Sequence, residues 1–146
     1  EQGKSLYQLL LDIYVEFGFY KESLLSLTKK GQEGVAAIKQ MMDNFRQKPP
    51  QTIDGSQVVF VKDYSEQECF DMISDLRYTI HLPKSDVLQF VTADNTILSI
   101  RPSGTEPKIK FYFGVRDEMK SVADYEQTDA KAGEKIKRII EELGLK

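Results

Sequence analysis

The first hydrophobic pattern in this 146-residue chain has helical spacing and lies close to the N-terminus. Ser5 and Gln8 have the form of a capping box, and the apolar residues that follow recur every three or four positions until Gly18. We therefore expect a helix over residues 5–17. The helix is apolar over a broad arc, which is typical of a helix that packs against its own domain, another domain or a partner.

A second helix is predicted after a break in the pattern. Residues 18–30 contain only a short apolar run before a Lys-Lys-Gly sequence, and we expect them to form an extended connector with a domain boundary near Thr28. From about residue 32 to residue 46 the apolar positions again have helical spacing, and Pro49 and Pro50 end the element.

The middle of the chain has short apolar runs and alternating apolar and polar residues, which are typical of β-strands. Residues 53–62, 86–92, 96–101 and 109–115 are predicted strands, and Ala93-Asp94-Asn95 indicates a tight antiparallel hairpin. Alternate residues of the last strand are apolar, so one face of the sheet should be buried by Ile109, Phe111, Phe113 and Val115. The other face is polar, and Tyr112 is the only aromatic residue that we expect on it.

Helices and about four strands together predict an α+β fold. Residues 63–81 have no clear period and are expected to form an irregular loop with a turn or more of helix. Residues 122–143 carry the apolar stripe of a C-terminal helix that ends at Gly144. The expected architecture is a four-stranded antiparallel sheet with helices on one face. We assign residues 1–27 to the tail of a preceding domain, as a helical appendage, and residues 28–146 to a C-terminal domain.

Residues 101–108 gather more groups that can bind phosphate than any other short stretch of the chain. They offer a guanidinium, two hydroxyls, a glycine backbone and an ammonium, from Arg101, Ser103, Gly104, Thr105 and Lys108. Two prolines bracket the loop and restrict it before an anion arrives. Because the loop joins two predicted strands of a rigid sheet, it lies where binding residues are often found.

The same residues are also common in ordinary turns between strands. A Pro-Ser-Gly-Thr sequence with a flanking Arg and Lys suits a solvated turn that has no ligand. Four basic residues in and after the loop favour the phosphate interpretation in a chain whose formal net charge is −3, namely Arg101, Lys108, Lys110 and Arg116. Phosphate titration separates the two interpretations.

The string from Arg101 to Lys108, with residues 109–113 after it and residues 82–90 before it, resembles a known family. It is similar to the C-terminal domain of the alpha-D-phosphohexomutases, in particular the bacterial phosphoglucomutase/phosphomannomutase type, and the likeness begins at about Gly3. The resemblance implies a TATA-box-binding-protein-like fold, preceded by a helix that closes the third domain in such enzymes, so the chain looks like a fragment. The family's loops of the T-A-S-H-N-P, D-G-D-x-D-R and G-E-E-S-G types, which carry the phosphoserine, the metal and the sugar contacts, are absent from the sequence.

The resemblance implies an isomerase of carbohydrate metabolism whose full-length form interconverts the 1-phosphate and 6-phosphate of glucose or mannose. It also implies that the non-reacting phosphate of the substrate is bound by Arg101, Ser103, Gly104, Thr105 and Lys108. Mg²⁺ and glucose 1,6-bisphosphate are expected for the full-length enzyme, and no catalytic residue, metal site or cofactor is expected in this chain. The expected partners are the sugar-phosphate substrate and the remaining domains of the same enzyme, so the fragment alone should be inactive.

Composition limits the other classes of function. No stretch approaches the roughly 20 apolar residues of a membrane helix, so we expect a cytoplasmic protein with no membrane partner. Cys69 and His81 are the only residues of their kinds, which argues against disulfides and against cysteine or histidine metal clusters. The alternative function is a stand-alone structural or nucleic-acid-binding module of similar topology. The acidic net charge differs from that of nucleic-acid binders, and we expect no nucleic-acid partner.

Overall fold

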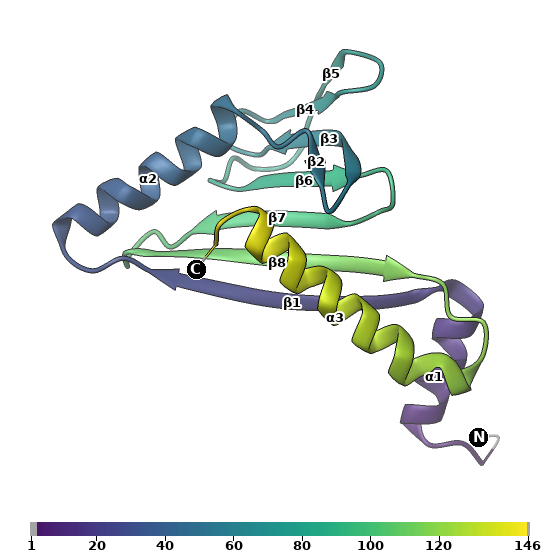
Figure 1. The fold of residues 1–146 in the computed structure, drawn as a ribbon. Coiled ribbons are helices and arrows are strands. Elements are labelled where there is room, and N and C mark those ends of the chain that lie inside the picture. The colour runs from purple at the N-terminus through teal and green to yellow at the C-terminus, as the bar shows by residue number, and fades with distance from the viewer. Residues whose placement is uncertain (1–2, 146) are drawn as a thin grey trace.

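The computed structural model describes residues 3–145 as one antiparallel sheet with helices (Figure 1). Residues 1, 2 and 146, which the predicted domain ranges include, lie outside the described part. The helices are α1 (Leu6–Phe17), α2 (Gln32–Gln47) and α3 (Tyr125–Glu142), with a 3₁₀ turn, η1 (Val122–Asp124), directly before α3. The strands are β1 (Phe19–Thr28), β2 (Thr52–Ile53), β3 (Ser56–Asp63), β4 (Glu68–Asp71), β5 (Leu76–Thr79), β6 (Leu88–Thr92), β7 (Ile97–Pro102) and β8 (Lys108–Asp117).

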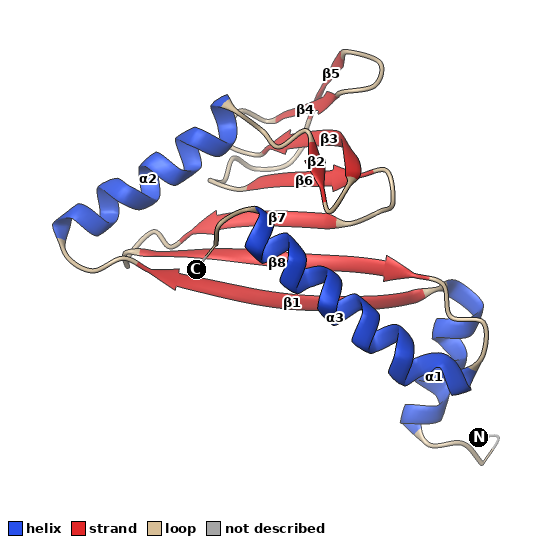
Figure 2. Cartoon of the chain, viewed as in Figure 1, coloured by secondary structure: helices blue, strands red, loops and turns tan. Residues whose placement is uncertain are grey.

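The strands follow one another across the sheet in the order β1, β8, β7, β6, β3, β4 and β5, and β2 pairs with β3. Every pairing is antiparallel. Helices α2 and α3 cover one face of the sheet, and Figure 2 shows them in blue over the red strands. The predicted α+β class is confirmed, although the sheet contains more than the four strands expected.

The core lies between this covered face and the two helices. The alternate residues of β8 that were predicted to be buried are all buried, as are Phe90 of β6 and Leu98 and Ile100 of β7. Helix α2 places Phe45 against Phe90 and Phe111, with ring centroids 6.1 and 6.2 Å apart. Helix α3 adds Ile136 and Ile139, so the predicted apolar stripe of the C-terminal helix is the stripe that packs on the sheet.

Strand β1 corrects the prediction of an extended connector over residues 18–30. The segment is extended, but it pairs with β8 along its whole length, from Phe19 opposite Asp117 to Thr28 opposite Lys108. Its inward positions include Lys21, whose Nζ lies 2.7 Å from Oδ1 of Asp129 on α3, so a charged residue stands where a buried strand would normally be apolar. Because Lys21 occupies an inward position, the apolar alternation that would predict a strand is interrupted in this segment. The assignment of residues 1–27 to a preceding domain stays a prediction.

A second correction concerns residues 63–81, which form the β4–β5 hairpin and not an irregular loop. The turn is made by the Asp71 carboxylate, whose Oδ1 accepts hydrogen bonds from the backbone N–H groups of Ile73 and Ser74 at 2.9 and 3.1 Å. All four residues of β5 are exposed, so no burial pattern marks the strand. Arg77 lies over the Phe70 ring at 4.3 Å, and this contact across the hairpin is also invisible in a hydrophobic profile.

Helix α1 begins with the predicted capping box, in which Gln8 N donates to Ser5 Oγ and Ser5 N donates to Gln8 Oε1. It packs on its own domain through Leu11 and through Tyr14, whose ring is stacked at 6.2 Å from that of Tyr125. Its other side stays exposed, with Leu6 at 86% of its full accessibility. Over residues 3–145, no helix combines the length and the apolar character needed to cross a membrane.

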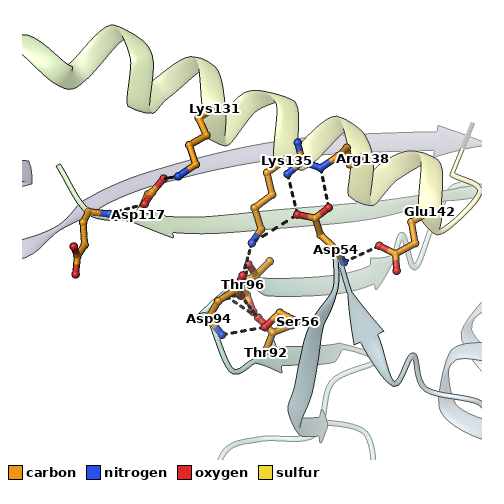
Figure 3. A network of polar contacts seen from close by, with 11 residues as sticks. Asp54, Ser56, Thr92, Asp94, Thr96, Asp117, Lys131, Lys135, Arg138 and Glu142 are labelled. Carbon is orange, nitrogen blue, oxygen red and sulfur yellow. Dashed lines mark hydrogen bonds and ion pairs between the residues drawn. The ribbon is translucent and has the colours of Figure 1, made fainter.

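A network of charged residues fastens α3 to two turns at the edge of the core (Figure 3). Arg138 donates two hydrogen bonds, of 2.8 and 2.9 Å, to the Asp54 carboxylate in the turn between β2 and β3. The predicted hairpin between β6 and β7 is confirmed, and its turn carries Asp94, which forms an ion pair with Lys135. The Nζ atom of Lys135 also lies 3.9 Å from Oδ2 of Asp54. Burial opposes the charged form of Asp94, but hydrogen bonds from Lys135, Thr92 and Thr96 outweigh it and hold the pKa of Asp94 well below its usual range.

Candidate functional site

The candidate loop connects β7 to β8, and β8 is hydrogen-bonded to a neighbouring strand on each side. The pairing of β7 with β8 continues into the loop, with Arg101 opposite Lys110 and Pro102 opposite Ile109. Ser103 N then donates to Lys108 O at 2.8 Å and closes the base of the loop. Because β8 also pairs with β1, neither arm of the loop is free to move away from the sheet.

Three further hydrogen bonds fix the loop from within and from outside. Ser103 Oγ accepts from Glu106 N at 3.3 Å, and Lys108 N donates to Glu106 O at 2.7 Å. From outside the loop, Lys29 N donates to Pro107 O at 2.8 Å, directly after β1 ends. The backbone of the loop is therefore held before any ligand binds, which lowers the ordering entropy that binding must overcome.

A concavity of about 220 Å³ lies at this end of the sheet. It is lined by Arg101, Pro102, Ser103, Gly104, Lys110 and Tyr112. Three of the five predicted phosphate ligands, Arg101, Ser103 and Gly104, thus face a common space. The other two do not line it, because Thr105 is exposed at the tip of the loop and Lys108 Nζ lies 3.1 Å from Glu106 Oε2.

Lys110 and Tyr112 line the concavity but were not among the predicted ligands. The sequence pattern could have identified both residues as neighbours of the loop. Alternation along β8 places residues 108, 110 and 112 on the open face, and antiparallel pairing across the loop places Lys110 opposite Arg101. The open face also carries Tyr20 of β1 and Tyr78 of β5, so the prediction that Tyr112 is its only aromatic residue is wrong.

Two cationic side chains, those of Arg101 and Lys110, line the concavity. Over residues 3–145, neither Arg101 nor Lys110 forms an ion pair or a side-chain hydrogen bond, whereas Lys21, Arg46 and Arg138 each pair with a carboxylate. Two like charges directly opposite one another on paired strands destabilise a sheet. A bound dianion would remove that repulsion, and the Ser103 hydroxyl still has its own hydrogen to donate.

The structure also locates the residues that could have supported other chemistry. Cys69 is a free thiol in β4, and burial raises its pKa. His81 is exposed just after β5. In the described part of the chain, no group of three or more His, Cys, Asp or Glu side chains is arranged to hold a metal ion. The Mg²⁺ and glucose 1,6-bisphosphate expected for a full-length enzyme stay predictions.

Comparison with known proteins finds a matching family model and phosphoglucomutase relatives. A sequence model of the family described as "Phosphoglucomutase/phosphomannomutase, C-terminal domain" matches residues 28–132. A phosphoglucomutase of Staphylococcus aureus (strain bovine RF122 / ET3-1) is 40% identical over 114 residues, which cover 78% of this chain and 20% of the relative. A phosphoglucomutase of Staphylococcus saprophyticus is 36% identical over 118 residues, which cover 81% of this chain and 21% of that protein.

Among solved structures, the open form of the Paramecium phosphoglucomutase parafusin aligns with 92% of this chain and 24% of its own, at 11% identity and a TM-score of 0.44. The family assignment rests on the sequence matches and not on this alignment. The chain spans only 20% of the length of the first relative named above.

Proposed function

Since this chain belongs to the phosphoglucomutase/phosphomannomutase C-terminal domain family, we propose that its loop 101–108 binds the non-reacting phosphate of a hexose phosphate within a full-length phosphoglucomutase. The observation that carries the proposal is the pair of cations, Arg101 and Lys110, that face one concavity without a carboxylate partner over residues 3–145. The loop's fixed backbone and its Ser103 hydroxyl add neutral donors beside them.

The residue types suit a phosphate monoester. A guanidinium can donate two parallel hydrogen bonds to two phosphate oxygens, whereas an ammonium acts as a point charge, so Arg101 fixes orientation and Lys110 adds attraction. Gly104 has no side chain that would meet the ligand, and a Cβ built on it has no neighbour within 4 Å. The backbone of the loop can therefore approach the anion closely.

Thr105 and Lys108 enter the proposal in different ways. The family resemblance makes both of them phosphate ligands, but neither lines the concavity. Lys108 pairs with Glu106 inside the loop, so we assign it first to holding the loop's shape. Thr105 stands at the exposed tip and reaches a bound phosphate only if the tip turns inward over it.

The proposed contribution of this domain to catalysis is position. Phosphoryl transfer needs an activated nucleophile and stabilisation of the charge that develops, and a clamp on the distant phosphate supplies neither. Holding that phosphate fixes the reacting hydroxyl relative to the rest of the enzyme, and orientation of this kind contributes on the order of 7 to 11 kcal/mol in the best intramolecular cases. Glucose is the proposed hexose because the named relatives are phosphoglucomutases.

Phosphate titration of the 146-residue chain, followed by amide NMR shifts, tests the proposal. We expect saturable shifts around Arg101, Ser103, Gly104 and Lys110. Arg101→Ala and Lys110→Ala should each weaken binding by at least tenfold, which corresponds to about 1.4 kcal/mol. Lys137→Ala is the matched control, because it removes an exposed cation from α3, where Lys137 pairs with Glu134.

Two outcomes would refute the proposal. Shifts that grow without saturation and are equal in all variants would mean that the loop is an ordinary turn in a structural domain. Equal weakening by the Lys137 control would mean that phosphate senses only the net charge of the chain.

A further inference from the structure

Strand β1 forms one of the two edges of the sheet (Figure 1). It is 10 residues long, and within the described residues 3–145 it pairs only with β8. The register with β8 runs from Phe19 to Thr28 without a shift, so no bulge twists the strand away from a straight ladder. The outer side of its backbone is therefore free along the whole strand.

The hydrogen bond of Lys29 shows which residues of β1 face this free edge. Lys29 N donates to Pro107 O, and the two residues continue the register in which Thr28 lies opposite Lys108. Hydrogen-bonded and non-hydrogen-bonded pairs alternate along an antiparallel ladder, so the odd-numbered residues of β1 direct their N–H and C=O groups toward β8. The even-numbered residues direct theirs to the free edge, namely Tyr20, Glu22, Leu24, Ser26 and Thr28.

The opposite edge of the sheet, β5, has features that discourage pairing with another chain, whereas β1 has few of them. Strand β5 is only 4 residues long and includes Arg77, and both short length and charge protect an edge strand. Strand β1 contains no proline, and its inward charge, Lys21, already pairs with Asp129 of α3. A long edge of this kind is a template for a further antiparallel strand.

The sequence of β1 suits a second copy of the same strand. With a two-fold axis at Leu24, an antiparallel pair engages all of the free backbone groups and sets Leu24 opposite Leu24 of the second copy. Glu22 then lies opposite Ser26, and Tyr20 lies opposite Thr28, so no like charges meet across the pair. Leu24 keeps 53% of its full accessibility in the single chain, and its counterpart would cover it.

We propose that two copies of this chain associate through β1, in an antiparallel pair that continues the sheet of one copy into that of the other. One strand pair is a small interface, so the dimer should be weak and reversible. The inference does not rest on the phosphate site, because the residues at the free edge of β1 are not those that line the concavity.

Analytical ultracentrifugation of the 146-residue chain over a range of concentrations tests the proposal. We expect the mean mass to rise from that of one chain toward that of two as the concentration increases. Leu24→Lys sets two ammonium groups opposite one another at the axis, and Leu24→Glu sets two carboxylates there, so each variant alone should stay a monomer. An equal mixture of the two variants should form the dimer again, because opposite charges then meet at the axis.

Leu76→Lys is the matched control, because Leu76 lies on the other edge strand and is 54% exposed, against 53% for Leu24. This variant should associate like the unchanged chain. Circular dichroism shows whether each variant is folded, and amide hydrogen exchange gives a measurement that needs no variant. The N–H groups of Tyr20, Leu24 and Thr28 should exchange more slowly at high concentration, because only the dimer gives them an acceptor.

Three results would overturn the inference. The first is a chain that stays monomeric, with unchanged amide exchange along β1, at every concentration. The second is a dimer that Leu76→Lys weakens as much as Leu24→Lys, since the contact would then not be specific to β1. The third is a mixture of the Leu24→Lys and Leu24→Glu variants that does not associate. None of these results bears on phosphate binding, so the proposed function would stand or fail by its own titration.

Discussion

Gly34 of α2 and Gly133 of α3 both lie inside helices, but a methyl group added to each would meet very different surroundings. At Gly34 the new Cβ would lie 2.2 Å from Lys29 O and 2.6 Å from Lys29 C. At Gly133 the nearest atom is the flexible end of Lys21, with Cε at 3.8 Å. The same substitution should therefore have opposite effects on stability at the two positions.

The magnitudes follow from helix propensity and from packing. In a helix interior, alanine is more favourable than glycine by about 0.8 to 1 kcal/mol, and Gly133→Ala should realise most of that gain. Overpacking costs typically about 1 to 3 kcal/mol, and the clash at Gly34 is with backbone, which yields less easily than a side chain. We expect Gly34→Ala to lose about 2 kcal/mol net. For a chain of this size that lowers Tm by roughly 4 to 8 °C, while Gly133→Ala raises it by about 2 to 4 °C.

Urea and thermal unfolding followed by circular dichroism measure both variants. Gly34→Ala should also weaken phosphate binding, because Lys29 must move and its N–H holds Pro107 of the candidate loop. Gly133→Ala should bind phosphate like the unchanged chain. If Gly34→Ala were stabilised as much as Gly133→Ala, the close packing of α2 on the end of β1 would be wrong, and with it the brace on the loop.

Three further predictions concern charge and chemistry. Arg101→Lys should leave Tm within a few degrees, because Arg101 is exposed, yet weaken phosphate binding measurably, since an ammonium cannot replace a two-pronged donor; a parallel loss of folding would make Arg101 structural. The pKa of Asp94 is lowered by folding, so its charge stabilises the fold above about pH 4 and that contribution disappears as pH falls toward the folded-state pKa. Asp94→Asn should thus be less stable than the unchanged chain at pH 7, with a difference that shrinks in acid denaturation curves below about pH 4. The purified chain should convert glucose 1-phosphate no faster than a mock preparation, because it carries neither the phosphoserine nor the metal loop; turnover above that background would contradict this.

The parts of the fold that pattern analysis could predict are those whose stability comes from apolar burial. Strand β8 alternates between core and open face, and α3 carries a stripe of isoleucines, so both were predictable from spacing alone. Strand β1 was missed because Lys21 and Ser23 occupy inward positions. The ion pair with Asp129 compensates the inward charge of Lys21. Because Asp129 lies on the last helix, no local sequence rule predicts this partner.

The candidate site also has a part that the sequence predicts and a part that only the fold brings together. The guanidinium, hydroxyl and glycine of the loop are local in sequence, and their chemistry predicted a phosphate ligand without any structure. Lys110 required one more step, because only the antiparallel register brings it opposite Arg101. The bond from Lys29 to Pro107 joins segments that no spacing relates, so the brace on the loop became visible only with the fold.

The physical unit that supports the loop extends further toward the N-terminus than the segment that matches the family. The match begins at residue 28, where β1 ends. Yet β1 supplies the second row of hydrogen bonds to β8, the strand that carries Lys108 and Lys110, and its exposed Tyr20 and Leu24 lie on the same face of the sheet as Lys110. Without β1, β8 would become an edge strand, with its ladder open to water beside the loop. The strand that precedes the family segment is therefore part of what holds the candidate site in shape.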